Sequence, residues 1–209
     1  SYTGKKIIYG ASFGVDYEEY TQADIDIIKP FYSNLDLVTV RESSGLELLQ
    51  KYQLTNPQAG VVLDPTLLLD KEDYIKVVED SNTTPPPGNM FCYILDMTEE
   101  KREMINQISN DKGLTPFEWS LDTQGSVEQW LRSFMDAEYI ITDSYHGMLF
   151  SIIFNKPFKL LRNKNRGTAR FDEIQDKLEI SEYEGYIDWN KINTQLKHLK
   201  DSSLKSIVL

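Results

Sequence analysis

The stretch that decides the fold is EYIITDSYHGMLFSIIFNKPF, residues 138–158. Its first apolar run, residues 138–142, has the pattern of a buried strand, and a second apolar run begins a helix near His146. Another strand is predicted over residues 156–163. A strand, a helix and a strand in this order predict a βαβ unit with parallel strands, which is the repeating element of α/β proteins.

The same alternation extends over the rest of the 209-residue chain. Pro30 lies inside one predicted helix and is expected to kink or end it. The chain is therefore predicted to be an α/β protein with parallel sheets and flanking helices. The other predicted strands cover residues 5–12, 35–42, 59–70, 89–97 and 114–120, and the other predicted helices cover residues 21–35, 43–54, 71–80, 98–113, 126–137, 167–180 and 189–209.

A proline-rich segment, SNTTPPPG at residues 81–88, is the best candidate for a linker between two domains. Residues 1–80 would then form an N-terminal domain and residues 89–209 a C-terminal domain. The first of these is short for a Rossmann-like domain, so we expect its N-terminal part to be missing from this sequence.

Composition excludes several classes of protein. The net charge is −11, whereas proteins that bind duplex nucleic acid usually carry a basic face, so nucleic acid is not an expected partner. Cys92 is the single cysteine and cannot form an internal disulfide, and no signal peptide is visible. These features favour a reducing, cytoplasmic location. The sequence contains no Cys/His ligand pattern, so no metal is predicted.

Polar residues follow the predicted strand 138–142, where α/β proteins bind ligands. Asp143, Ser144 and His146 lie between this strand and the next helix, and Gly147 permits close approach of a backbone or ligand. A helix N-terminus disfavours the charged imidazolium and keeps a histidine available as a base near pH 7. His146 is therefore a candidate general acid or base; the alternative is a hydrogen-bonded core histidine.

Four cations follow the next strand, in a chain that is otherwise acidic: Arg162, Lys164, Arg166 and Arg170. They run into a Gly-Thr helix start, and arginine side chains together with helix N–H groups bind phosphate or carboxylate. The alternative is a solvated loop. Arg41 lies between a predicted buried strand and a helix start, and is a further candidate for binding an anion.

Five blocks resemble the polysaccharide pyruvyl transferases in order and spacing: YGASFG, VTVRESSG, VVLDPTLLLD, TDSYHGMLFSIIFNKPF and RGTARF. The resemblance covers residues 5–180, and the TDSYHG block is its most specific element. It implies two Rossmann-like domains in a GT-B-like arrangement, preceded by an N-terminal segment rich in glycine and asparagine that this sequence lacks.

The resemblance also implies a reaction. Members of the family move a pyruvyl group from phosphoenolpyruvate onto hydroxyls of a glycan, in the biosynthesis of capsular, exopolysaccharide or cell-wall polysaccharides in bacteria. His146 matches the catalytic histidine, with Asp143 beside it, and Arg41 matches an arginine that binds the donor. Ser144 and Gly147 are expected to contact substrate.

At one position the chain departs from the family pattern. Some branches carry Arg-Leu before the histidine, where this chain has Ser144-Tyr145. We expect Arg166 or Arg170 to supply the missing cation. The expected partners are phosphoenolpyruvate as donor substrate, with no other cofactor, and a glycan or lipid-linked saccharide, which would allow peripheral association with a membrane.

Two other functions fit the same residues. A GT-B glycosyltransferase would use the basic loop to bind a nucleotide sugar, and a non-catalytic carbohydrate-binding fragment would use neither His146 nor the arginines for chemistry.

Overall fold

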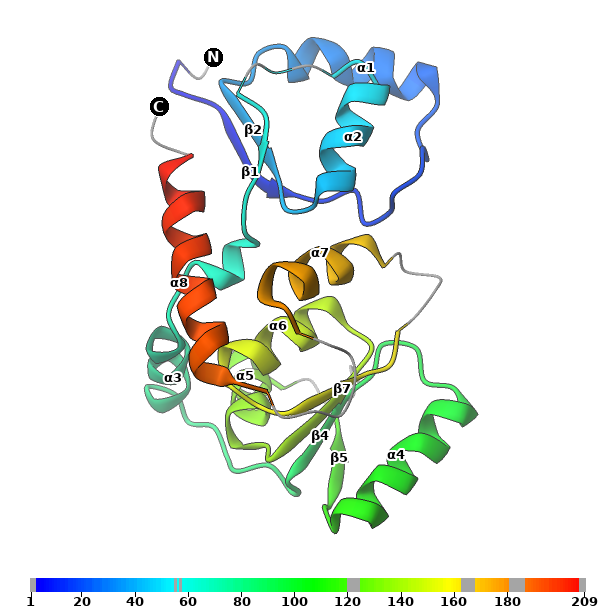
Figure 1. Cartoon of the computed structure of the whole chain (residues 1–209), viewed down its shortest axis with the longest axis vertical. Coiled ribbons are helices and arrows are strands. Elements are labelled where there is room, and N and C mark those ends of the chain that lie inside the picture. The colour runs from blue at the N-terminus through cyan, green and yellow to red at the C-terminus, as the bar shows by residue number, and fades with distance from the viewer. Residues whose placement is uncertain are drawn as a thin grey trace. The chain divides into compact units, whose positions relative to one another are not determined.

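The computed structural model describes residues 3–54, 56, 58–119, 125–162, 168–180 and 187–206. They form an α/β fold with two parallel sheets, which confirms the predicted class (Figure 1). The chain divides into two compact units. Unit 1 consists of Ser1–Leu68, Lys164–Ile180 and Asn190–Leu209, and unit 2 consists of Leu69–Asn163 and Ser181–Trp189.

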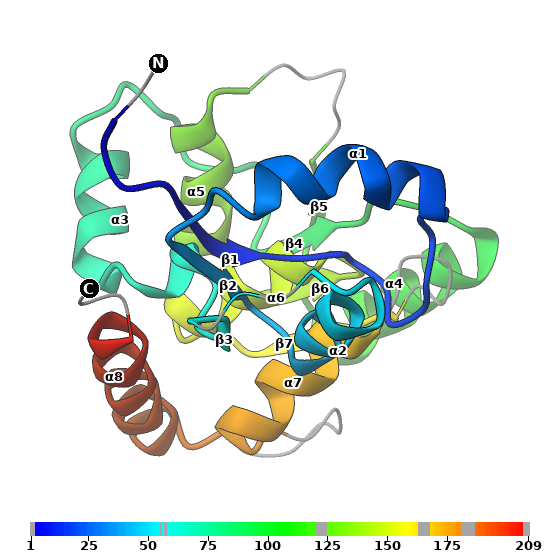
Figure 2. The ribbon, with the colours of Figure 1, turned by 90° about the horizontal axis from the view of Figure 1, so that it is seen from above.

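Unit 1 is built on a parallel sheet of three strands in the order β1 (Ile7–Ala11), β2 (Leu37–Val40) and β3 (Gly60–Val61). Helices α1 (Gln22–Tyr32) and α2 (Ser43–Lys51) pack on one face through a core of apolar side chains. The other face carries the side chain of Tyr9, which lies close to Ser203 of α8 (Trp189–Lys205). Strands β1–β3 thus lie between α8 and the pair α1 and α2 (Figures 1 and 2).

Pro30 was expected to kink or end helix α1; the helix does not end there but continues for two more residues to Tyr32. Proline removes one helical hydrogen bond. Pro30 is exposed, and Ile25 and Tyr32 anchor the helix in the core on either side of it. Packing of these two residues therefore outweighs the lost bond.

Unit 2 contains a parallel sheet of four strands in the order β5 (Pro116–Glu118), β4 (Met90–Tyr93), β6 (Tyr139–Thr142) and β7 (Phe158–Leu160). The chain first moves outward from β4 to β5, then returns to the other side of β4 and continues through β6 to β7. The direction reverses between β4 and β6, and ligands of open α/β sheets bind outside the strand ends at such a switch point.

Helices cover both faces of this sheet. Helix α4 (Glu99–Lys112) packs on one face, where Met90, Cys92 and Ile141 are buried. Helices α5 (Val127–Asp136) and α6 (Tyr145–Ile153) cover the other face, and α3 (Lys71–Glu79) packs against α5. An aromatic cluster fills this second layer, with ring centroids of neighbouring pairs 4.8 to 5.1 Å apart; it includes Phe91, Phe134, Trp130, Phe150 and Tyr74.

The division between the units differs from the predicted one. The segment 81–88, predicted as a linker, belongs to unit 2, where it is hydrogen-bonded to α5. Gln129 exchanges two hydrogen bonds with the Thr84 backbone, and Arg132 donates to the carbonyl and hydroxyl oxygens of Thr83. The chain passes between units at Leu68 instead, and α7 (Ala169–Leu178) and nearly all of α8 return to unit 1. Proline content alone did not reveal these contacts.

Candidate active site

Asp143 lies at the switch point of unit 2, directly after β6. Its Oδ1 accepts a hydrogen bond from the Leu95 N–H (2.7 Å), and its Oδ2 accepts from the Asp96 N–H (3.2 Å) and from Lys101 Nζ (2.6 Å). Leu95 and Asp96 follow β4, so one carboxylate joins the ends of the two strands that flank the switch point. Lys101, in the first turn of α4, also donates to the Asp96 carbonyl (2.8 Å). Asp143 therefore fixes the loop after β4.

His146 is the second residue of α6 and is half-buried, with its ring 5.5 Å from that of Tyr145. The prediction that a helix begins near His146 is confirmed. Ser144 is the N-cap of this helix, and its Oγ accepts a hydrogen bond from the Gly147 N–H (3.3 Å). His146 thus lies in the first turn of α6, just beyond the carboxyl end of β6.

Gly147 has a packing role. A Cβ at this position would lie 2.1 Å from the Thr142 hydroxyl, which is far inside contact distance. The Thr142 hydroxyl donates to the Tyr93 carbonyl (2.7 Å) and accepts from the Ser144 N–H (3.1 Å), so it has little freedom to move. Only glycine allows α6 to start this close to the end of β6, and Gly147 thereby positions His146.

A second group of polar residues lies where the strands of unit 1 end. Arg41 follows β2, and its Nη1 is paired with Asp64 Oδ2 beyond β3. The Asp64 Oδ1 accepts from the N–H (2.9 Å) and the hydroxyl (2.7 Å) of Thr66. Burial would raise the pKa of Asp64, but the Thr66 hydrogen bonds and the Arg41 guanidinium outweigh it and leave the pKa lowered. Asp64 is thus ionised at neutral pH and orients Arg41.

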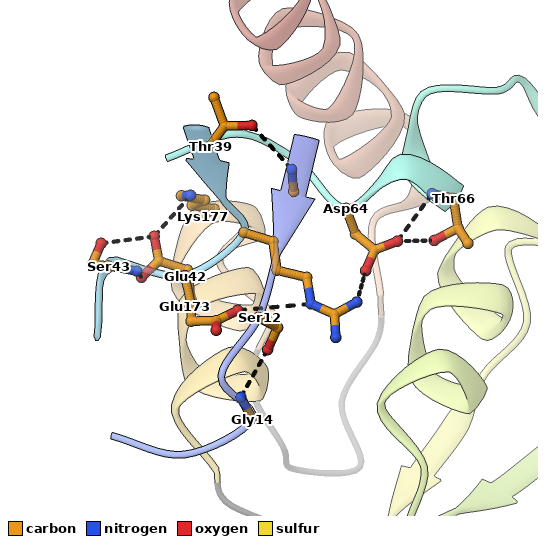
Figure 3. A network of polar contacts seen from close by, with 11 residues as sticks. Ser12, Gly14, Thr39, Glu42, Ser43, Asp64, Thr66, Glu173 and Lys177 are labelled. Atoms are coloured by element: carbon orange, nitrogen blue, oxygen red, sulfur yellow. Dashed lines mark hydrogen bonds and ion pairs between the residues drawn. The ribbon is translucent and has the colours of Figure 1, made fainter. Parts of the chain in front are cut away.

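Glu42 is the N-cap of α2 and the most unusual residue of this group (Figure 3). Its side chain is 2% exposed, and Oε2 lies 3.7 Å from Arg41 Nε. Burial raises its pKa, and this effect is only partly offset by nearby Ser12, Arg41, Phe13 and Arg170. Arg41 and Arg170 therefore act electrostatically on the same carboxyl group, although they are far apart in sequence.

Arg170 reaches this site from α7. A Cβ built on Gly14, in the loop after β1, would lie 4.0 Å from Arg170 Nη1, and Gly14 itself has a φ of +80° that a larger residue would adopt only with strain. From the same helix, Glu173 accepts from the N–H (3.1 Å) and the hydroxyl (3.2 Å) of Ser43. Helix α7 is thus attached to the loop after β1 and to the N-terminus of α2.

The structure sorts the predicted site residues into two groups. Unit 2 holds His146, Asp143, Ser144 and Gly147 together, whereas unit 1 holds Arg41 and Arg170. Arg162 follows β7 in unit 2, so the basic cluster of residues 162–170 is divided between the units; Lys164 and Arg166 lie outside the described residues.

Sequence reasoning missed Lys101, Glu42 and Glu173. Lys101 and Glu173 lie in charged stretches on predicted helices, and no local pattern distinguishes them from surface residues. Glu42 stands next to Arg41 in the VTVRESSG block, directly after an apolar strand. That strand is the sequence feature that could have indicated the burial of Glu42.

Two other features of the described residues bear on function. No group of three or more His, Cys, Asp or Glu side chains is arranged there to hold a metal ion, and no described helix has the length and apolarity to span a membrane. Cys92 is buried in the core of unit 2, and burial raises the pKa of its thiol to about 12, so it packs there as a thiol and not as a thiolate.

Comparisons with known proteins give one informative match. A model of the family described as polysaccharide pyruvyl transferase matches residues 1–165. No curated protein matches significantly. Two solved structures of the wall teichoic acid polymerase TagF align with 98% of this chain, at 13% and 11% identity and TM-scores of 0.39 and 0.40; one was soaked with CDPG. The chain spans about 60% of the length of these structures.

Proposed function

Because this chain belongs to the polysaccharide pyruvyl transferase family, we propose that it transfers a pyruvyl group from phosphoenolpyruvate to two hydroxyls of a glycan in polysaccharide biosynthesis. One acceptor oxygen bonds to C2 of the enolpyruvate while C3 gains a proton. The second oxygen then displaces phosphate from C2. The two hydroxyl protons end on the new methyl group and on the departing phosphate, and the products are a cyclic ketal and inorganic phosphate.

The observation that carries this proposal beyond the family match is the convergence of Arg41 and Arg170 at the strand ends of unit 1. Phosphoenolpyruvate carries a phosphate and a carboxylate, and a guanidinium binds either group through parallel hydrogen bonds. The pairing of Arg41 Nη1 with Asp64 orients the planar guanidinium at this site. Arg170 adds a second cation to the strand-end site of unit 1.

We assign proton transfer to His146, either from an attacking hydroxyl or to C3 of the donor. Asp143 is assigned a positioning role, because the N–H groups of Leu95 and Asp96 and the Lys101 ammonium occupy both of its oxygens. Ser144 and Gly147 likewise serve the start of α6. We propose that the reaction takes place in the cytoplasm, with a glycan or lipid-linked saccharide as acceptor.

The test is release of inorganic phosphate from phosphoenolpyruvate, with ketal formation followed by mass spectrometry, on a panel of pyranosides that carry vicinal or 1,3-diols. His146→Ala should lower turnover by roughly 10²–10⁴-fold. The matched control is His198→Ala, which removes the other histidine, exposed on α8, and should leave turnover unchanged. Wild-type turnover in His146→Ala would contradict the assignment. Binding of nucleotide sugars without binding of phosphoenolpyruvate would instead favour a glycosyltransferase.

A further inference from the structure

Glu42 is a buried carboxyl group whose hydrogen-bonding capacity is not met within the described part of the chain. Both of its carboxylate oxygens are inaccessible to solvent, and neither has a hydrogen-bond partner there. The Ser12 hydroxyl and the Phe13 N–H lie near the group but do not reach bonding geometry. A buried carboxylate without hydrogen bonds is costly to keep ionised. Burial therefore favours the protonated, neutral form of Glu42.

The charged residues around Glu42 come from three segments of unit 1: the ends of β2 and β3, and helix α7. Arg41, its neighbour, lies 3.7 Å away through Nε, and Arg170 acts on it from α7. Asp64, after β3, is paired with Arg41, and Glu173 of α7 is paired with Lys177 (2.8 Å) and bonded to Ser43. The pKa values of Asp64 and Glu173 are both lowered. Of these three carboxyl groups, Glu42 is thus the one whose pKa is raised, because burial outweighs the effect of its neighbours.

We propose that the strand-end site of unit 1 binds its anionic ligand together with one proton, and that Glu42 takes up that proton. The inference rests on the proposed function in one respect, the use of Arg41 and Arg170 to bind an anion. It goes further by naming a residue that links binding of the anion to pH.

The physical reason is the change of charge around Glu42 on binding. An anion at Arg41 and Arg170 adds negative charge close to Glu42 and offsets the two cations that keep it ionised. Both effects favour the neutral acid. Linkage is reciprocal, so protonation of Glu42 strengthens binding of the anion to the same degree. In the pH range between the pKa values of the free and the bound site, uptake of one proton makes the affinity fall by about tenfold for each unit rise in pH.

The experiment is calorimetric titration of the full chain with inorganic phosphate and with phosphoenolpyruvate, from pH 5 to 8, in two buffers of different ionisation enthalpy. Wild-type protein should take up about one proton more per bound anion than Glu42→Gln within this range, because the titration of the anion itself is common to both proteins. Glu42→Gln should also show a flatter dependence of affinity on pH and tighter binding than wild type at pH 8. Uptake that is absent from wild type, or unchanged in Glu42→Gln, would overturn the proposal.

A second measurement needs no ligand. Because the folded-state pKa of Glu42 is raised, its ionisation destabilises the fold as pH rises through that pKa, and the effect is absent below the pKa of the unfolded chain. Glu42→Gln should therefore raise Tm relative to wild type near pH 8 and not near pH 4. The control is Glu47→Gln, an exposed glutamate on the same helix, which should show no such difference. Equal Tm shifts at the two pH values would count against the proposal.

The two proposals fail differently. Proton-linked phosphate binding without pyruvyl transfer would leave the Glu42 inference standing and remove the proposed function. Pyruvyl transfer with proton-independent binding would do the reverse. If neither anion binds at any pH, both are wrong.

Discussion

Each unit ends its parallel strands with a buried aspartate that is neutralised by a cation, and the two arrangements differ in what that cation is bonded to. In unit 2, Lys101 pairs with Asp143 and donates its other observed hydrogen bond to a backbone carbonyl. In unit 1, Arg41 pairs with Asp64 and lies beside Glu42, a carboxyl with raised pKa. Lys101 therefore holds the loop after β4 in place, whereas Arg41 is part of a charged cluster at the strand ends.

Similar strand-end carboxylates therefore serve different purposes in the two units. Asp143 bonds two backbone N–H groups across the switch point, so its task is to hold β4 and β6 at a fixed separation at their ends. His146, one helical turn onward in the chain, depends on that geometry. Asp64 bonds Thr66, only two residues away, and its remaining oxygen orients Arg41. Unit 1 thus organises a cluster of charges, whereas unit 2 positions His146, the residue to which we assign proton transfer.

The largest expected effect comes from breaking the Asp143 contacts. Asp143→Ala leaves Lys101 without its carboxylate and two backbone N–H groups without acceptors, and should destabilise the protein by about 3–5 kcal/mol. Chemical denaturation measures this free energy. Asp111→Ala, an exposed aspartate at the end of α4, is the control and should change little.

A double-mutant cycle sharpens this prediction. If Lys101 and Asp143 act as one unit, Lys101→Met should add little to the loss already caused by Asp143→Ala. Simple additivity of the two losses would show that the ion pair does not fix the switch point.

The next effect concerns the arginines of unit 1. Arg170→Met removes one of two cations near Glu42 and should weaken binding of phosphoenolpyruvate by roughly 10- to 100-fold, the value of one or two hydrogen bonds to a charged group. The turnover at saturating donor should stay near that of wild type. Arg102→Met, which removes an exposed arginine of unit 2, is the control. A loss confined to turnover would place Arg170 in the chemistry rather than in donor binding.

A smaller effect is expected from the bond between α7 and α2. The pKa of Glu173 is lowered, because its bonds to Lys177 and Ser43 outweigh the opposing effect of burial. Glu173→Gln should therefore cost about 0.5–1 kcal/mol at pH 7. This cost should disappear as pH falls through the folded-state pKa, since the lowered pKa contributes stability only while the group is ionised. Thermal unfolding at pH 7 and pH 3 tests this, with the exposed Asp176→Asn on the same helix as control.

The fold was largely predictable, because alternating apolar strands and amphipathic helices are local patterns. The helix near His146 and the parallel order of β6 and β7 follow from residues that are close together in the sequence. The division into units was not predictable in this way. It depends on α7 and α8 returning to unit 1, through contacts such as that between Leu63 N–H and Ser203 Oγ (2.9 Å), which join distant parts of the chain.

The candidate site was predictable in part for the same reason. Residue type and position at a strand end pointed to Arg41, Asp143 and His146. The partners that decide what these groups can do come from elsewhere. Lys101 occupies Asp143, and Glu42 is buried by segments that follow β1 and β2 and by α7. Burial of a charged residue by distant segments leaves no periodic pattern in the sequence.

The most direct test of the central claim is calorimetric titration of phosphoenolpyruvate into His146→Ala and Arg41→Ala under one set of conditions. The claim is that unit 1 binds the donor anion and unit 2 transfers the proton. His146→Ala should bind the donor within about twofold of wild type, whereas Arg41→Ala should bind at least roughly 100-fold more weakly, as expected when a charged hydrogen-bonding partner is removed. Loss of binding in His146→Ala with normal binding in Arg41→Ala would contradict the account.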